Sequence, residues 1–367
     1  MRILLTGGGS GGHVFPLIAV ARKLMQRDET AELLFIGPDK PSKTIFDKEG
    51  ISAVLILSGK FRRYLSPFFV LDILKLPIGF LQAYWHIFWF MPDVVFSKGG
   101  YGSVLPVLIC WLFRVPIIIH ESDSVPGLAS KILAGFSKLV AVSFLESVKF
   151  FPQNKTIITG SPIRDELFTK IPKDPQYILG TGSGKPKVLI LGGSQGAKQI
   201  NDLLMLALPD FIKKYEIIHQ CGEKNFKNMQ KVALLEIKNP EERRMYHLYP
   251  FLSEEQLASA YALADVIISR AGSGAIFEIA ASGKPSILIP YMAAAGDHQM
   301  KNAQIYKEAG AARMLRGKNI MPHMLEGLID SILGNQEGIA AMSAAARNFA
   351  KPDAAGKIAE EIVRLPV

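Results

Sequence analysis

The sequence predicts an α/β protein built from two Rossmann-like domains. Short apolar runs alternate with longer amphipathic stretches along the whole chain, which is typical of parallel strands covered on both faces by helices. A strand, a glycine-rich turn and a helix start follow one another at residues 3–12, and the same order returns at residues 188–196. The chain has 367 residues, which suits two domains of roughly 150–200 residues each.

The expected strands are short apolar runs bounded by glycine, proline or polar residues. In the first half they are Ile3–Thr6, Leu33–Ile36, Ala53–Leu57, Val94–Ser97, Pro116–Ile119, Leu139–Val142 and Thr156–Thr159. In the second half they are Lys187–Leu191, Glu216–His219, Met245–Pro250, Val266–Ser269 and Ser286–Pro290. We expect two domains, residues 1–163 and 164–347, and a C-terminal helix in 348–367 that packs back on the first domain.

The composition indicates a folded protein of the cytoplasm. Apolar residues make up 49% of the chain and charged residues 20%, a balance typical of globular rather than disordered proteins. The N-terminal MRILLTGGG is a short strand running into glycines, without the longer apolar stretch and cleavage site of a signal peptide. Cys110 and Cys221 have no CxxC spacing, so neither a disulfide framework nor a zinc site is expected.

The net charge of +9 suits an anionic partner. Because no basic motif with interleaved aromatic residues is present, nucleic acid is not the expected one. The expected anionic partner is therefore a phosphorylated substrate or an anionic lipid surface.

The most apolar segment is Phe68–Met91. It is long enough to cross a bilayer, but Asp72 and Lys75 interrupt it, so we do not expect it to span one. Two interpretations stay open. A helix or helix pair can lie on the membrane surface, with Trp89 and its aromatic neighbours at the interface and basic residues upstream near the headgroups, or it can be a core helix. Those basic residues are Lys60, Arg62 and Arg63.

The first glycine turn, Gly7–Gly12, follows a strand and has the GxGxxG spacing. Glycines there allow backbone N–H groups to approach a phosphate at a helix N-terminus. A dinucleotide-dependent oxidoreductase also needs an acidic residue at the end of the second strand, and Asp39 lies beyond that position. A second phosphate turn is also unexpected for one NAD, so the oxidoreductase reading is disfavoured.

His13 follows the glycines directly, at the carboxyl end of a strand and the start of a helix. Ligands bind at such positions in open α/β sheets. A neutral imidazole there can act as a general base, and the helix dipole lowers its pKa. His13 is therefore a candidate catalytic residue.

The second half contains polar groups suited to a nucleotide sugar. Backbone amides of Gly192–Gly196 and the Ser194 hydroxyl can hold a diphosphate, and Arg164 can reach the same anion. Glu278 lies one helical turn beyond a third glycine-containing junction and can accept both ribose hydroxyls. No DxD pair suggests a divalent cation, so metal-independent transfer without a cofactor is expected, with helix dipoles and arginine stabilising the leaving group. Residues that can read sugar hydroxyls are Asp297, His298, Gln299 and Asn302.

Seven motifs follow one another along nearly the whole chain: GGGSGGHVFP (7–16), SKGGYGS (97–103), HESDSVPGLASK (120–131), TGSPIR (159–164), LGGSQGA (191–197), SRAGSGAIFE (269–278) and DHQMKNA (297–303). Together they resemble the MurG family of UDP-N-acetylglucosamine transferases, glycosyltransferase family 28. The resemblance implies a GT-B fold, in which two Rossmann-like domains with parallel sheets face a central cleft. It places the acceptor and the membrane at the N-terminal domain and the donor at the C-terminal domain.

The resemblance also implies roles for individual residues. His13 and Glu121 are the candidate catalytic residues, with His13 preferred as the base. Two positions depart from the family pattern: Asp123 stands where the family often has asparagine, and His298 where it often has glutamine. The UDP-GlcNAc-binding residues implied are Ser10, Gly11, Gly12, Asp123, Arg164, Ser194, Leu252, Ser273, Gly274, Ala275, Ile276, Phe277, Glu278, His298 and Gln299.

The function implied is inverting transfer of GlcNAc from UDP-GlcNAc to the C4 hydroxyl of MurNAc in lipid I, giving lipid II for peptidoglycan synthesis. The implied partners are UDP-GlcNAc, lipid I, anionic lipid at the cytoplasmic face of the cell membrane and other cell-wall synthesis proteins. A diacylglycerol glycosyltransferase or a UDP-GlcNAc 2-epimerase is the alternative among enzymes. A nucleotide-sugar-binding scaffold is the alternative that is not an enzyme.

Overall fold

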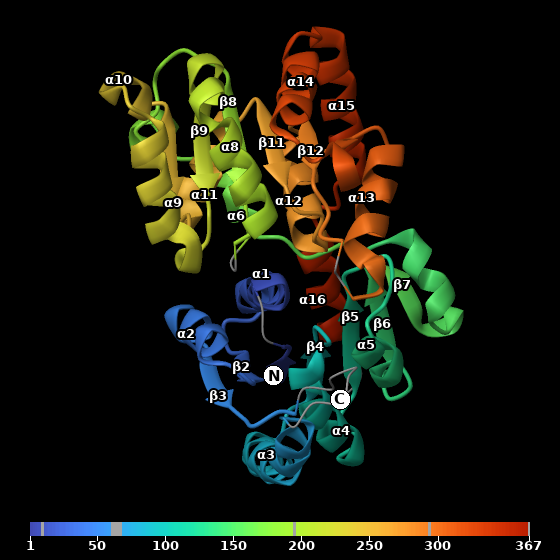
Figure 1. Ribbon diagram of the computed structural model, residues 1–367. Helices are drawn as coiled ribbons and strands as arrows, with labels where there is room; N and C mark the ends of the chain where they lie inside the picture. The colour runs from blue at the N-terminus through green and yellow to red at the C-terminus, as the bar shows by residue number, and fades with distance from the viewer. Residues whose placement is uncertain (9–10, 60–67, 194–195, 293–294, 366–367) are drawn as a thin grey trace. The chain divides into compact units, whose positions relative to one another are not determined.

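The computed structural model describes residues 1–8, 11–59, 68–193, 196–292 and 295–365. The chain forms two compact units (Figure 1). Unit 1 contains Met1–Arg164 and Lys351–Val367, and unit 2 contains Asp165–Ala350. The chain therefore returns to unit 1 at Lys351, three residues after the expected 348. Within the described residues, no helix is both long and apolar enough to cross a membrane.

In its described part, unit 1 holds a seven-stranded sheet in the order β3-β2-β1-β4-β5-β6-β7, with every pair parallel. The order reverses between β1 and β4, and open α/β sheets bind ligands outside the carboxyl ends of strands at such a point. The strands are β1 (Arg2–Thr6), β2 (Glu32–Gly37), β3 (Ser52–Leu55), β4 (Val94–Ser97), β5 (Ile117–Glu121), β6 (Leu139–Val142) and β7 (Thr156–Ile158).

Helices cover both faces of this sheet (Figure 1). The C-terminal helix α16 packs beside α1, because Ala355, Ile358, Ala359 and Ile362 form an apolar stripe that joins the core around β1. The α-helices of unit 1 are α1 (Gly11–Arg27), α2 (Lys40–Lys48), α3 (Phe68–Phe90), α4 (Val104–Leu112), α5 (Leu128–Leu133) and α16 (Ala354–Arg364). Its 3₁₀ helices are η1 (Tyr101–Ser103), η2 (Leu145–Phe150) and η3 (Gln153–Lys155).

The apolar segment of the first half forms the single helix α3, with Pro77 inside it. One face carries Ala83 and Ile87 into the core that also contains residues of α4. The other face exposes Trp85 and Trp89, the latter by 66%. The helix is therefore a core element on one side and an apolar surface on the other. Lys60, Arg62 and Arg63 lie outside the described residues.

Unit 2 repeats this arrangement. Its described strands form a parallel sheet in the order β10-β9-β8-β11-β12-β13, which reverses between β8 and β11. The strands are β8 (Lys187–Leu191), β9 (Glu216–Gln220), β10 (Tyr246–Tyr249), β11 (Val266–Ser269), β12 (Ser286–Leu288) and β13 (Arg313–Met314). The helices are α6 (Glu166–Thr169), α7 (Pro175–Leu179), α8 (Lys198–Lys214), α9 (Glu223–Glu236), α10 (Pro240–Arg243), α11 (Glu254–Leu263), α12 (Ser273–Ser282), η4 (Ala295–Asp297), α13 (His298–Glu308), η5 (Gly317–Asn319), α14 (Pro322–Leu333) and α15 (Gln336–Phe349).

The predicted α/β class and the parallel sheets are confirmed. Each expected strand coincides with an observed one to within two residues at either end. The strand β13 was not expected, because two residues between two glycine-containing segments are too short to give an apolar pattern.

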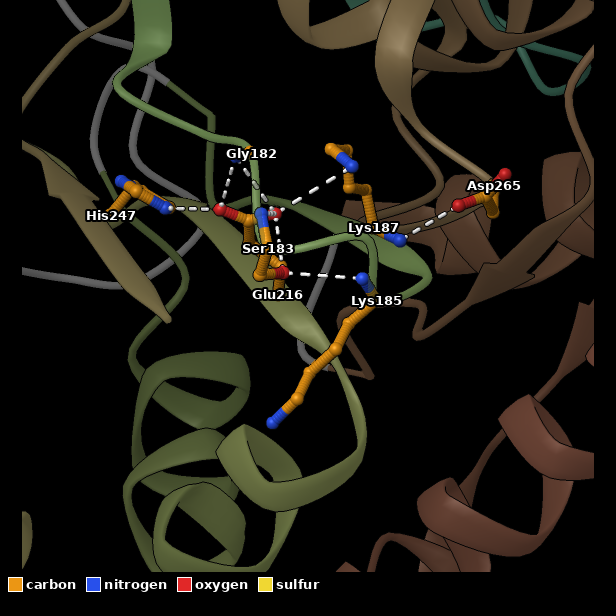
Figure 2. A network of polar contacts seen from close by, with 7 residues as sticks. All are labelled: Gly182, Ser183, Lys185, Lys187, Glu216, His247 and Asp265. Carbon is orange, nitrogen blue, oxygen red and sulfur yellow. Dashed lines mark hydrogen bonds and ion pairs between the residues drawn. The ribbon is translucent and has the colours of Figure 1, made fainter. Parts of the chain in front are cut away.

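A buried carboxylate fixes the amino-terminal edge of the unit 2 sheet (Figure 2). Glu216, the first residue of β9, accepts hydrogen bonds from Gly182 N (3.1 Å), Ser183 Oγ (2.9 Å) and His247 Nε2 (3.0 Å), and Lys187 Nζ lies 3.6 Å away. Burial alone raises the pKa of Glu216, but the hydrogen bonds from Ser183, His247 and Gly182 outweigh it and hold the pKa below its usual value. The network ties the segment entering β8 to β9 and β10, at the edge opposite the glycine turn.

Candidate functional site

The first glycine turn lies at the switch point of the unit 1 sheet, between the carboxyl ends of β1 and β4. A Cβ atom added to Gly8 would lie 3.2 Å from Gly102 N, and one added to Gly102 would lie 3.0 Å from Gly7 O. The two turns therefore pack backbone against backbone, which is why glycine is needed there. Gly11 and Gly12 open helix α1. Ser10 lies outside the described residues.

His13 is the third residue of α1. A Cβ added to Gly100 would lie 3.2 Å from His13 Cε1, so the ring sits against the turn that follows β4. Burial first, and then the positive charge of Lys98, lower the pKa of His13 to about 4, against the opposing charge of Asp123. His13 is therefore uncharged at neutral pH and can accept a proton.

Glu121 ends strand β5, in the motif HESD. Its Oε1 accepts from Asp123 N at 2.9 Å and its Oε2 accepts from Gly127 N at 3.2 Å. Burial, and then the nearby charge of Asp123, raise the pKa of Glu121. Both carboxylate oxygens thus hold the turn 121–127.

The neighbouring His120 is fully buried. Its Nε2 lies 3.0 Å from Gly160 O and 3.3 Å from Ser143 Oγ. Burial and the charge of Lys98 lower the pKa of His120. Two uncharged imidazoles and two carboxyl groups therefore meet at this edge of the unit 1 sheet.

Arg164 is the last residue of the first unit 1 segment. Its guanidinium lies over the ring of Phe15, 4.1 Å from the ring centroid, and its side chain is buried. This cation–π contact fixes Arg164 beside the start of α1.

The second glycine turn lies at the switch point of unit 2 and differs from the first. Gly193 and Gly196 both have positive φ, 72° and 75°. A Cβ at Gly196 would overlap the Asn225 amide and the Cys221 carbonyl, whereas one at Gly193 would meet nothing within 4 Å. Ser194 lies outside the described residues.

Leu252 is buried in the loop between β10 and α11. Its N–H donates to Gln220 Oε1 at 3.0 Å, so that group is already satisfied and only the carbonyl of Leu252 remains for a ligand. The carbonyl of Gln220 accepts from Gly192 N at 3.0 Å. Gln220, at the end of β9, therefore connects the glycine turn to the Leu252 loop.

The SRAGSGAIFE motif forms the end of β11 and the first six residues of α12. Ser273 opens the helix, and Gly274 and Ala275 are partly exposed beside it. Ile276 and Phe277 point into the core, so they can meet a ligand only through their backbone. Glu278 Oε2 accepts from Tyr261 OH at 3.1 Å, which orients the carboxylate.

His298 and Gln299 open helix α13. Gln299 Oε1 accepts from Tyr291 N at 3.0 Å. Further along the helix, Asn302 is buried and its Nδ2 donates to Ala271 O at 3.3 Å. This bond ties the start of α13 to the loop between β11 and α12, so the two junctions form one polar edge of unit 2.

The structure thus brings those predicted residues that it describes together in two groups, one along the carboxyl edge of each sheet. It adds two residues that the sequence did not single out, Lys98 in unit 1 and Gln220 in unit 2. Both directly follow or end an apolar strand, a position that signals closeness to the site. Among the described residues, no group of His, Cys, Asp and Glu side chains is arranged to hold a metal ion.

Comparison with known proteins identifies the family. The glycosyltransferase family 28 N-terminal domain matches residues 3–142, and the C-terminal domain of the same family matches residues 187–358. A Bacillus cereus protein named UDP-N-acetylglucosamine–N-acetylmuramyl-(pentapeptide) pyrophosphoryl-undecaprenol N-acetylglucosamine transferase 2 is 38% identical over 339 residues, 92% of each chain. The chain belongs to glycosyltransferase family 28.

Solved structures show the same fold. The crystal structure of Acinetobacter baumannii MurG is 26% identical and covers 99% of each chain with a TM-score of 0.71. A UDP-GlcNAc 2-epimerase from Neisseria meningitidis aligns with a TM-score of 0.70 at 13% identity, covering 99% of this chain and 100% of its own. The family 28 chain therefore has the GT-B fold, and it is sequence identity rather than fold that separates transferases from epimerases.

Proposed function

We propose that the protein transfers GlcNAc from UDP-GlcNAc to the C4 hydroxyl of MurNAc in undecaprenyl-pyrophosphoryl-MurNAc-pentapeptide, converting lipid I to lipid II. The observation that carries the proposal is the pair of sites at the two sheet switch points. One holds an uncharged, partly buried histidine among carboxyl groups, and the other is a glycine turn backed by neutral polar side chains. Identity of 35–38% to transferases of this name over at least 92% of the chain supports the substrate pair.

In the proposed reaction the acceptor O4 attacks C1 of GlcNAc, and the bond from C1 to the UDP oxygen breaks with inversion. The O4 proton passes to an imidazole nitrogen of His13, and the electron pair of the broken bond leaves with UDP. Backbone N–H groups at the start of α8 and the guanidinium of Arg164 are suited to the charge that develops on the diphosphate.

His13 is a better base than Glu121. Both oxygens of Glu121 already accept backbone N–H groups of its own turn, so taking up a proton there would weaken the turn. His13 is uncharged at neutral pH and lies at the start of α1. Its low pKa makes it a weak base in the resting protein, and an anionic substrate beside it would raise that pKa.

The donor is assigned to unit 2. We place the diphosphate at Gly192–Gly196 and Ser194, the ribose at Glu278 and the uracil at the Leu252 carbonyl. The sugar is assigned to His298, Gln299 and, from unit 1, Asp123. The backbone of Ser273, Gly274, Ala275, Ile276 and Phe277, together with Ser10, Gly11 and Gly12, completes the proposed donor contacts.

The test is direct. The purified protein is incubated with radiolabelled UDP-GlcNAc and a detergent-solubilised lipid I analogue, and the lipid product is digested to identify the linkage. A β-1,4-linked disaccharide lipid is expected. Absence of transfer across several detergents would overturn the proposal. Product formed from the donor alone would instead indicate an epimerase, and transfer to diacylglycerol a lipid glycosyltransferase.

We further propose that α3 places the enzyme on anionic lipid at the cytoplasmic face of the membrane. Its outer face exposes Trp85, Phe88 and Trp89, and Trp111 on α4 is also exposed. Unit 1 also carries Lys131 and Lys149, whose ammonium groups lie 5.0 and 5.4 Å from the centroid of the Phe150 ring. Aromatic rings flanked by cations suit the headgroup region.

Vesicle sedimentation tests this placement. Trp89→Glu should reduce binding to vesicles containing phosphatidylglycerol by about tenfold, because a charge replaces the apolar ring that would be buried in the membrane interface. Tyr177→Glu is the matched control, since Tyr177 is an aromatic residue of unit 2 that is 82% exposed. Equal binding by wild type and the Trp89 variant would show that α3 does not meet the membrane.

A further inference from the structure

Lys98 is a buried lysine at the switch point of unit 1. It directly follows β4, and its backbone N–H donates to Thr6 O at 2.8 Å, which fixes it between β1 and β4. Only 3% of the residue is exposed. Its Nζ donates a hydrogen bond to Ser122 Oγ, in the HESD turn after β5. A lysine is rarely buried to this extent without a charged partner.

The titratable groups that face this ammonium come from two elements. Glu121 and Asp123, at and after the end of β5, attract it. His120 on β5 and His13 at the start of α1 both experience its positive charge. One cation therefore stands among two carboxyl groups and two imidazoles.

The charges of this cluster depend on one another. Burial lowers the pKa of Lys98 to about 8, although Glu121 and Asp123 oppose the change. Lys98 is the second cause, after burial, of the low pKa of His13. The charge of Asp123 opposes the ionisation of Glu121, and the Lys98 ammonium counters that repulsion.

We propose that Lys98 is a positioning residue for sugar transfer: its buried ammonium, bonded to Ser122, holds the Glu121–Asp123 turn beside the His13 imidazole. This inference rests on the proposed function for its kinetic consequence, but its electrostatic part concerns the folded protein alone. Asp123 and Lys98 form a matched pair, in which the charge of the aspartate is balanced by a buried cation.

The experiment measures the His13 titration first. Protein labelled with ¹³C at histidine Cε1 is followed by NMR from about pH 3.5 to 8, and His13→Ala assigns the signal among the 7 histidines. In Lys98→Met the pKa of His13 should rise measurably, towards 6.5, since one of the two causes that lower it is removed. Lys155→Met is the matched control, because Lys155 is a part-buried lysine whose ammonium donates to the carbonyls of Ala134 and Ser137. An unchanged His13 titration in a folded Lys98→Met protein would overturn the proposal.

The variant Asp123→Asn gives a second, independent test of the pairing between Asp123 and Lys98. Because Asp123 supports the charge of Lys98, its removal should lower the pKa of Lys98 below about 8, measured on ¹³C-labelled lysine Cε. This variant tests the pairing even where Lys98→Met fails to fold. A Lys98 titration that does not move would contradict the pairing.

The pH profile of transfer then connects the cluster to activity. Wild-type kcat/KM should fall above about pH 8, as Lys98 loses its proton, and below about pH 4, as His13 gains one. In Lys98→Met the fall in kcat/KM at alkaline pH (the alkaline limb) should disappear, and the fall in acid (the acid limb) should occur at a higher pH. The kcat of this variant should be about 10–100-fold lower. Adding Asp123→Asn should restore part of that loss. Absence of transfer by wild type would reject the proposed function alone, whereas wild-type transfer with unchanged limbs in Lys98→Met would reject the role of Lys98.

Discussion

Unit 1 and unit 2 share one strand order but equip their switch points differently. In unit 1 the polar groups beneath the glycine turn are ionisable: His13, Lys98, His120, Glu121 and Asp123. Their charges set one another's pKa values over a few residues. Such a cluster suits proton transfer, because small changes of charge alter which group holds the proton.

In unit 2 the groups beneath the turn are neutral amides and an uncharged histidine. Asn201 and Asn225 both donate to Cys221 O, at 3.0 and 2.9 Å, and His219 joins Asn201 to Tyr246. Burial lowers the pKa of His219 to about 3, so it carries no charge. A neutral, hydrogen-bonded support suits a ligand that brings its own charge, since a carboxylate there would repel a diphosphate.

The difference indicates a division of labour on a shared fold. Changes in unit 1 should alter turnover and its pH dependence, and changes in unit 2 should alter donor binding or stability at an unchanged pH profile. The glycine turns follow the same division. Gly8 and Gly102 allow a close backbone approach, whereas Gly193 and Gly196 supply positive φ.

The largest effect is expected from His13→Ala. Removing the proposed base should reduce kcat by about 10²–10⁴-fold, with UDP binding by calorimetry changed less than about twofold. His323→Ala is the control, because His323 is an exposed histidine of unit 2 and should leave both quantities unchanged. A loss of tenfold or less would move the base to another group.

Gly196→Ala should produce the next largest effect, on stability. The variant combines a positive φ with overlap of Cβ on the Asn225 amide and the Cys221 carbonyl, which together cost about 3–4 kcal/mol in the free energy of unfolding. Gly193→Ala has the same φ penalty and open space around Cβ, so it should lose only about 1–2 kcal/mol. Urea unfolding measures both. Equal losses would mean that the Asn225 amide and the Cys221 carbonyl can move away from an added Cβ at little cost.

Glu216→Gln tests the part of unit 2 farthest along the strands from the turn. Gln cannot accept at both side-chain atoms, so the variant should lose about 2 kcal/mol in the free energy of unfolding. The pKa of Glu216 is lowered in the fold, so its contribution is present above its unfolded value of 4.5 and disappears as pH falls through the folded value. The difference in the free energy of unfolding between Glu216→Gln and wild type should therefore become smaller at acid pH. Asp202→Asn, at an exposed ion pair with Lys198, should change stability by less than about 0.5 kcal/mol. A loss of stability in Glu216→Gln no larger than that in Asp202→Asn would contradict the structural role of Glu216. A change in the rate of GlcNAc transfer by Glu216→Gln would contradict it as well.

The sequence predicted the sheets well because buried parallel strands are continuous apolar runs, and their ends coincide with glycine turns. The site positions were inferred through motif resemblance, residue by residue, and they stay predictions. Lys98 lies within the SKGGYGS motif, but its burial could not be predicted from the sequence, because a lysine after a strand usually lies in solvent. Its burial depends on Thr6 and Ser122, which are distant along the chain.

Some distinctions needed side-chain contacts. The Phe68–Met91 segment left core and surface as alternatives, and the helix has both, with Ile87 buried and Trp89 exposed. Glu121 was a candidate base from its motif alone, yet its hydrogen bonds show a carboxylate that holds its own turn. The periodicity of apolar residues identifies the faces of a helix, but it does not show which face packs against the rest of the protein.

The smallest effect, and the sharpest test of the division, is expected from Gln220→Leu. Leucine keeps the volume but leaves Leu252 N–H without its acceptor, while the backbone bond from Gly192 to residue 220 is retained. The Leu252 loop should loosen, and KM for UDP-GlcNAc should rise about tenfold, which corresponds to one lost hydrogen bond of about 1.4 kcal/mol. We expect kcat within about twofold of wild type and unchanged pH limbs, because no group of the unit 1 cluster is altered. Gln304→Leu, on the exposed side of α13, should leave KM unchanged. If Gln220→Leu instead moved the pH limbs, as Lys98→Met is expected to, the two switch points would be coupled and proton handling would not belong to unit 1 alone.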